Sequence, residues 1–222
     1  MRRYGAIVRD PDVVRLGLRT GRAALDDLGL LLIQDGALPA VTTIVAGAPV
    51  RGSWWSHEQA HSIFDVLQEL YDDAAVVKLI ARKQTLVHRR LWPALVAVAS
   101  GRSAWQVDGL SDDARAALAE IDASDAPIRA DRLAATMSRK ASDVVRELEV
   151  RLLVATTEVH TETGRHVKAA QTWTTWATAS SVALATLPSA ADGRRALEEC
   201  VRRMDAARVA RLLPWPVDSD DR

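Results

Sequence analysis

The sequence predicts a mainly α-helical protein with two small β-hairpins, arranged as a tandem of winged helix-turn-helix units. The main observation is the stretch from Ser138 to Trp173, where a helical pattern passes directly into a hairpin pattern. Apolar side chains first recur with the spacing of one helix face, at Ala141, Val144, Val145, Leu148 and Leu152. Alternating residues then occupy 156–161 and 165–170, with Gly164 between them. An earlier part of the chain repeats the order of helix, short helix, longer helix and hairpin.

The composition allows a substantial core but provides no overall charge for binding nucleic acid. The chain has 222 residues, 48% of them hydrophobic, and a formal net charge of +0. Any electrostatic argument for nucleic acid must therefore depend on where the charges lie. Cys200 is the single cysteine, which excludes a disulfide framework and fits a reducing cytoplasm. We see neither a signal peptide nor an apolar run near the roughly 20 residues that span a bilayer, so we expect a cytoplasmic protein without a membrane partner.

The repeated order of elements predicts four segments. They are an N-terminal helical arm (1–22), a first winged-helix-like unit (23–107), a second such unit (108–176), and a C-terminal helix and tail (177–222). We expect a linker at 101–109 between the units. The units share element order but not residues, so they are topological repeats and not a sequence repeat.

The first helices are predicted from capping and breaking residues. Asp10 and Pro11 suit the cap and the first position of a helix, which we expect to end at Gly21. A second helix is expected over 22–34 and a short helix over 39–45.

The rest of the first unit is predicted to be a helix, a hairpin and another helix. Ser56 with Gln59 three residues later predicts a capping box at the start of the longer helix. Alternating apolar residues over 74–88 predict a hairpin with a polar tip, and 90–100 returns to the helical pattern.

The second unit and the tail are predicted in the same way. Ser111 caps its first helix, a short helix follows at 130–135, and the longer helix covers 139–152. In the tail, Ser189 with Asp192 predicts another capping box, and the closing Leu-Pro-Trp segment is expected to dock.

Acidic residues are absent from two stretches, 74–107 and 163–191, that include the two hairpins. Such basic stretches favour contacts with phosphates of double-stranded DNA. The third helix of each unit would contribute base contacts from its N-terminal residues, as in helix-turn-helix proteins. The alternative is that these charges are simply solvated. The expected DNA-binding residues are Arg82, Lys83, Arg89, Arg90, Arg139, Lys140, Ser142, Arg146, Arg165 and Lys168, with Trp54 and Trp55 for stacking.

Residues His57 to His61 match the H-E-x-x-H motif, in which two histidines on one helix bind zinc. The extended form of the motif fails, because Phe64 and Leu67 stand where it has Gly and His. We therefore expect no metal and no cofactor. If zinc were bound, its ligands would come from His57, His61, His160 and His166.

The second hairpin has a predictable register. A three-residue loop ending at Gly164 places Val159 opposite Val167 and His160 opposite His166, whereas a two-residue loop would mismatch these partners. The favoured register gathers four polar side chains on the other face: Glu158, His160, His166 and Lys168. This group can be a metal site, a phosphate site or an acid–base pair, or it can belong to an exposed wing. The candidate catalytic residues are Glu158, His160, His166 and His57.

Three stretches resemble signature sequences of a bacterial protein family of unknown function. They are GSWWSHEQAH (52–61), VHRRLWPAL (87–95) and EVHTETGRHV (158–167). Shorter members of that family run almost directly from the tryptophan-containing helix to the hairpin, which implies that 111–157 is an elaboration here. More loosely, the layout resembles the tandem winged-helix DNA glycosylases that unhook crosslinks, although their glutamine-centred catalytic motif has no match in this chain.

These observations predict a double-stranded DNA-binding protein and not an enzyme. The first alternative is a nucleic-acid-processing or repair enzyme, glycosylase-like or nuclease-like, that uses the His/Glu cluster of the second hairpin. The second alternative is a protein-interaction module without a ligand. Steep salt dependence of DNA affinity would distinguish the first hypothesis from the last.

Overall fold

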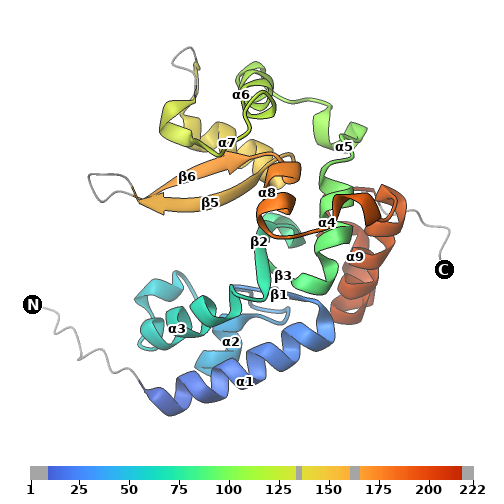
Figure 1. Cartoon of the computed structure of the whole chain (residues 1–222). Coiled ribbons are helices and arrows are strands. Elements are labelled where there is room, and N and C mark those ends of the chain that lie inside the picture. Colours follow the sequence, from blue (N-terminus) through green and yellow to red (C-terminus); the bar gives the residue numbers. More distant parts are fainter. Residues whose placement is uncertain (1–9, 134–136, 161–165, 217–222) are drawn as a thin grey trace, which may run out of the picture.

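The computed structural model describes residues 10–133, 137–160 and 166–216, and in these ranges the chain is mainly helical (Figure 1). Two small antiparallel sheets complete it, each with three strands. The predicted mainly α protein with two hairpins is confirmed, and each hairpin carries a third strand that we did not expect. None of the described helices is long and apolar enough to cross a membrane.

The first unit forms a sheet with the strand order β1-β3-β2. Its elements are α1 (Pro11–Leu28), β1 (Leu30–Leu32), α2 (Val41–Ala46), α3 (Ala60–Leu70), β2 (Ala74–Lys78) and β3 (Gln84–His88). Asp10 caps α1 as predicted, and its side chain accepts a hydrogen bond from the amide of Asp12 at 2.9 Å.

The predicted break between two helices at Gly21 is wrong, because α1 is continuous through this residue. A Cβ at Gly21 would lie 3.3 Å from a methyl group of Leu70, so the glycine allows α1 and α3 to approach closely. The helix ends instead at Gly29, which has the left-handed φ of 77° that terminates many helices.

The predicted capping box at Ser56 is also wrong. A 3₁₀ turn, η1 (Trp54–Ser56), ends at His57, whose backbone is extended (φ −79°, ψ 148°), and α3 begins only at Ala60. His57 Nδ1 accepts a hydrogen bond from the amide of Gln59 at 3.2 Å. Local side-chain bonds of this kind compete with helix formation.

The second unit has the corresponding strand order, β4-β6-β5. Its elements are α6 (Asp112–Asp122), β4 (Ile128–Arg129), the 3₁₀ turn η4 (Ala130–Arg132), α7 (Ala141–Val150), β5 (Ala155–His160) and β6 (His166–Gln171). Ser111 caps α6 as predicted, accepting from the amide of Ala114 at 3.2 Å. Both units therefore run helix, strand, short helical element, longer helix and hairpin.

The expected linker at 101–109 contains a structured element, α5 (Ala104–Val107). Its Gln106 is fully buried, and the side-chain amide donates to the carbonyl oxygens of Ala99 at 3.0 Å and Arg151 at 3.2 Å. One side chain thus satisfies backbone groups in both units, which fixes the units to one another.

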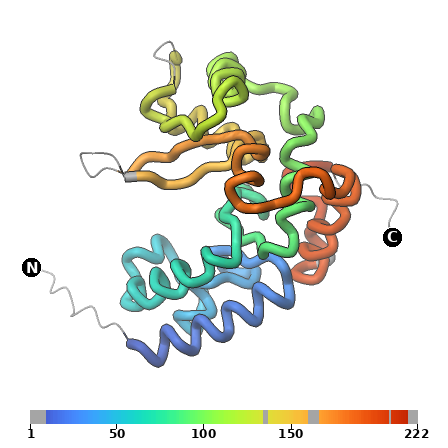
Figure 2. Tube along the Cα trace, viewed as in Figure 1, coloured from blue at the N-terminus to red at the C-terminus, as the bar shows by residue number. Residues whose placement is uncertain are grey.

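The remaining helices, one at the end of the first unit and three after the second hairpin, form a supporting layer. They are α4 (Trp92–Ala99), α8 (Trp173–Ala179), α9 (Ala190–Asp205) and α10 (Val209–Leu212), with 3₁₀ turns at Ile80–Arg82 (η2), Arg89–Leu91 (η3), Leu184–Thr186 (η5) and Ala206–Arg208 (η6). Figure 2 shows α9 lying along α4. Gly193 allows this close packing, since a Cβ there would lie 2.7 Å from the carbonyl oxygen of Ala94. The predicted capping box is confirmed, with Ser189 Oγ accepting from the amide of Asp192 at 3.1 Å.

The largest buried apolar cluster joins segments that are far apart in the sequence. It contains Leu32 and Leu95 from the first half of the chain, Leu152 and Trp173 from the second unit, and Trp215 from the tail. Trp215 is only 2% exposed, so the tail docks as predicted. This common core holds the two units together along one side.

Candidate functional site

A cleft of about 700 Å³ lies between α3 and β2 of the first unit and α7, β5 and β6 of the second. Figure 1 shows β5 and β6 of the second hairpin above α3, so that the second unit lies above the first in this view. Ligand-binding pockets in proteins usually have about 300–1,000 Å³ and often lie where two domains meet. The cleft is therefore the candidate functional site.

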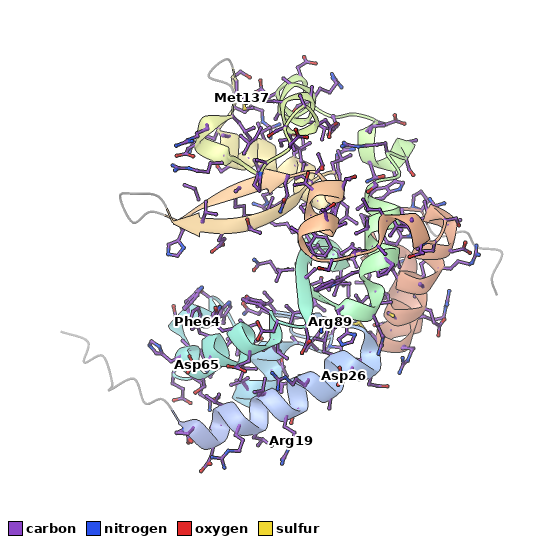
Figure 3. All side chains as sticks on the ribbon, in the orientation of Figure 1. Arg19, Asp26, Phe64, Asp65, Arg89 and Met137 are labelled. Atoms are coloured by element: carbon purple, nitrogen blue, oxygen red, sulfur yellow. The ribbon has the colours of Figure 1, made fainter. Side chains whose placement is uncertain are left out.

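Seven aromatic side chains line the cleft: Trp54, Trp55, Phe64, Tyr71, Trp92, Trp173 and Trp176. Trp54 and Trp55 stack with their ring centroids 4.0 Å apart, and the Trp55 ring lies 5.7 Å from Phe64. Trp55 is 61% exposed. Figure 3 shows Phe64 on the edge of α3 that faces the second hairpin. The entrance therefore presents flat aromatic surface that no other part of the described chain covers completely.

Charged groups from three elements meet inside the cleft. Glu149 of α7 is 7% exposed, and its Oε1 accepts hydrogen bonds from Lys168 Nζ and, at 2.6 Å, from Thr156 Oγ1. Its other oxygen, Oε2, lies 3.6 Å from Lys78 Nζ of β2, which is an ion pair between the two units. Among the described residues, Oε2 has no hydrogen-bond partner.

The environment of Lys78 lowers the pKa of its amine. Burial lowers the pKa of Lys78, the positive charges of Lys168 and Arg146 add to this effect, and Glu149 opposes it. A lysine of this kind is deprotonated more readily at physiological pH than an exposed one. Perturbed amines in clefts are frequent at functional sites.

Tyr71 lies at the end of α3, on the same side of the cleft as Lys78, and its pKa is shifted upward. Burial raises the pKa of the Tyr71 phenol, and the carboxylate of Glu158 raises it further. The phenol therefore keeps its proton at neutral pH and can donate a hydrogen bond into the cleft.

The predicted register of the second hairpin is confirmed. Val159 pairs with Val167, His160 with His166, and Glu158 with Lys168. Glu158, His166 and Lys168 line the cleft. His166 Nδ1 lies 3.9 Å from Glu158 Oε2, and both side chains are largely exposed, so this pair belongs to the entrance. The side chain of His160 and all of Arg165 lie outside the described part of the chain.

The H-E-x-x-H match at His57 to His61 lacks the single helix that the zinc motif requires. His57 and Glu58 precede α3, so the two histidines are not on one helix. Neither histidine lines the cleft. Among the described residues, no group of three or more His, Cys, Asp or Glu side chains is placed to hold a metal ion.

Several of the expected DNA-binding cations are engaged within the protein. Lys83 Nζ lies 2.6 Å from Asp35, and Arg89 lies 3.5 Å from Asp73. Arg90 donates to the last carbonyl oxygens of α1, including that of Asp27 at 3.0 Å. Arg139 pairs with Glu147 at the start of α7. Exposed ion pairs contribute about 0–1 kcal/mol, so only the buried contacts of this group are costly to break.

The remaining expected residues divide between the surface and the cleft. Arg82, Lys140, Ser142 and Arg146 are exposed, while Trp54 is half-buried in the cleft wall. Lys168 points to Glu149 and not to the outer surface. The structure thus brings five of the predicted residues to the cleft: Glu158, His166 and Lys168 of the second hairpin, with Trp54 and Trp55.

Sequence reasoning missed Glu149 and Lys78. Glu149 follows Val145 by four residues, so it lies on the apolar face of α7, where a carboxylate is unusual. A carboxylate on the apolar face of a helix could therefore have marked Glu149 as a candidate site residue from the sequence alone. Lys78 closes an apolar strand, and nothing in its local sequence indicates that it meets Glu149.

The chain matches no protein-family model, no curated protein and no solved structure. Its function must therefore be argued from the geometry of the cleft.

Proposed function

We propose that this protein is a tandem winged-helix protein that binds nucleic acid and accepts an unstacked base in the cleft between its two units. The observation that carries the proposal is the composition of this cleft, which combines aromatic walls with two lysines on its floor. Base–aromatic stacking contributes about 1–3 kcal/mol per base and suits any base sequence.

The order of elements supports the winged-helix architecture. Each unit has a helix and a strand, then a helical pair, then a hairpin whose last strand pairs with the first strand. A helix-turn-helix pair followed by a two-stranded wing has this order, and in such domains the second helix of the pair approaches the DNA.

The outer face of α7 is the better candidate for contacts with a duplex. Its exposed N-terminal residues include Ser142 and Arg146, preceded by Lys140. The corresponding helix α3 exposes His61, Phe64, Gln68 and Glu69 and contains no lysine or arginine. We therefore expect the second unit to hold the nucleic acid backbone.

The charges around the cleft can attract an anionic aromatic ligand. Lys78 and Lys168 balance the carboxylates of Glu149 and Glu158 in the lining, and the exposed Arg146, near Lys78 but outside the lining, adds one positive charge. A nucleotide offers both a ring to stack and a phosphate to attract. Removing a base from a duplex costs a few kcal/mol, and this cost is smaller for an unpaired base.

The test compares three labelled DNA molecules of the same sequence by fluorescence anisotropy: a single strand, a duplex with one unpaired base, and a fully paired duplex. We expect the first two to bind more tightly, with affinity falling steeply as salt increases. Trp55→Ala should weaken their binding about 5- to 150-fold, which corresponds to the loss of about 1–3 kcal/mol of stacking.

The matched control is Leu16→Ala, because Leu16 is 55% exposed on α1 and does not line the cleft. This variant should bind like the unchanged protein. Binding that Trp55→Ala does not weaken, or no binding at low salt, would reject the proposal.

The protein-interaction module is the second candidate, because Trp55 and Phe64 are exposed large apolar side chains on one side of the cleft. Exposed apolar patches often mark protein interfaces. In that case the apolar contact would be nearly independent of salt, whereas phosphate contacts would not.

A further inference from the structure

Lys78 and Glu149 form a buried ion pair whose charged atoms are too far apart for a hydrogen bond. The Nζ–Oε2 distance of 3.6 Å exceeds that of a hydrogen bond, although the Lys78 side chain is only 18% exposed and that of Glu149 only 7%. Buried carboxylate oxygens are normally hydrogen-bonded, yet Oε2 has no partner among the described residues. Both groups line the cleft. A small polar group of a ligand can therefore approach the partly exposed amine, while the buried carboxylate oxygen lies 3.6 Å from that amine and is free to accept a proton from it.

The groups that face Lys78 are those that activate an amine. Lys168 and Arg146 add positive charge, Glu149 supplies the single nearby carboxylate among the groups that perturb it, and burial removes water. Placing a second cation beside a desolvated lysine is a known way to keep its amine neutral and nucleophilic.

We propose that Lys78 forms an imine with an aldehyde of the nucleic acid bound in the cleft, such as the open-chain sugar at a position that has lost its base. The choice of this aldehyde rests on the proposed function above. The missing base also leaves room beside the aromatic walls. The assignment gives the cleft a covalent chemistry that the histidines of the hairpin do not provide.

The reaction balances with groups of this chain alone. The Lys78 amine attacks the carbonyl carbon, a C–N bond forms, and the carbonyl oxygen takes a proton from Lys168. Glu149 Oε2 accepts the proton that Nζ loses, which gives a neutral carbinolamine. The hydroxyl group then takes this proton from Glu149 and leaves as water, and the nitrogen is left as a protonated imine. No oxidant or reductant is required.

The test is reduction of the imine to a stable amine with sodium borohydride, followed by mass mapping of the modified residue. The chain has only four lysines, Lys78, Lys83, Lys140 and Lys168, so the mapping is simple once the N-terminal amine is included. One probe is an oligonucleotide with a single abasic position. The second is pyridoxal 5′-phosphate, an aromatic aldehyde that does not depend on nucleic acid. Anisotropy of the labelled oligonucleotide is measured in the same samples.

We expect the adduct at Lys78, and we expect Lys78→Arg to reduce it at least tenfold while the oligonucleotide still binds. Arginine retains the positive charge beside Glu149, and thermal unfolding will show that the variant is folded. Lys83→Arg is the matched control and should be trapped like the unchanged protein, because Lys83 lies at the surface beside Asp35.

The outcomes separate the two proposals. An oligonucleotide that binds while neither probe is trapped at Lys78 overturns the imine and leaves the proposed function standing. Trapping of pyridoxal 5′-phosphate at Lys78 without oligonucleotide binding supports the reactive amine and overturns the proposed function. Trapping that is equal in Lys78→Arg overturns the assignment of this residue.

Discussion

The first hairpin, β2 and β3, ends in a tip that is packed into the protein, whereas the second hairpin, β5 and β6, extends away from its unit (Figure 1). The tip of the first hairpin contains Ile80, which is fully buried and lies in the same apolar cluster as Val209 and Leu212 of α10. Near the tip of the second hairpin, Glu158 and His166 are mostly exposed. Both hairpins therefore line the cleft, but the tip of the first is part of the scaffold, whereas the outer end of the second forms the entrance.

The cations near the two hairpin tips also differ in where their acidic partners lie. Lys83 and Arg89 of the first hairpin region pair with Asp35 and Asp73 at the surface. Lys168 of the second hairpin turns inward to Glu149. Of the first basic stretch, only Lys78 at the end of β2 turns inward like Lys168, and it meets the same carboxylate, Glu149, while Lys83 and Arg89 pair at the surface.

The largest effect should come from truncating the buried tip. Ile80→Ala removes a fully buried side chain and is expected to reduce the free energy of unfolding by about 2–5 kcal/mol. The matched change, Val167→Ala, affects a half-buried side chain of the second hairpin and should cost less than about 1 kcal/mol. Urea denaturation measures both. If both variants lost the same free energy of unfolding, the tip of the first hairpin would contribute no more to stability than the second hairpin does.

A smaller effect, dependent on pH, is expected at the surface pair of the first hairpin. Burial favours a higher pKa for Asp35, but hydrogen bonds from Lys83 and from the amides of Leu38 and Ala37 outweigh it and hold the pKa below its usual value. A lowered carboxyl pKa stabilises the fold above the unfolded-state pKa, and this contribution is lost as pH falls through the lower folded-state pKa.

Asp35→Asn should therefore cost about 1 kcal/mol at neutral pH, a modest value because Lys83 is half exposed. The difference from the unchanged protein should shrink as the pH falls below about 4, near the ordinary aspartate pKa. Urea denaturation at a series of pH values checks this, with Asp72→Asn on the exposed turn before β2 as the control. A difference that stays constant down to acid pH would contradict the assigned role of Asp35.

The parts of the fold that depend on neighbouring residues could be predicted from the sequence. The register of the second hairpin follows from matching Val159 with Val167 across a short loop, and the caps at Asp10 and Ser111 follow from local hydrogen bonds. Gly21 was misjudged because its role depends on Leu70, a tertiary contact that no local pattern contains.

The site was harder to predict for the same reason. The second hairpin was identified as a candidate site, and part of it does line the cleft. Its chemistry, however, depends on Lys78 from the first unit approaching Glu149 from the second, and on tryptophans of three different segments lining the walls. Such convergence is a property of how the two units pack, which the common core determines.

The smallest effect should appear in the salt dependence of nucleic acid binding. Lys140 is exposed directly before α7 of the second unit, whereas Lys83 of the first hairpin is paired with Asp35. If the second unit holds the backbone, Lys140→Ala should weaken binding by less than about tenfold and reduce the slope of log affinity against log salt by about 1, which is the loss of one phosphate contact. Lys83→Ala should leave the slope unchanged, because its ammonium is already compensated within the protein. The reverse result, a lower slope for Lys83→Ala alone, would place the nucleic acid on the first hairpin. The tip of that hairpin would then be a binding surface and not only a part of the scaffold.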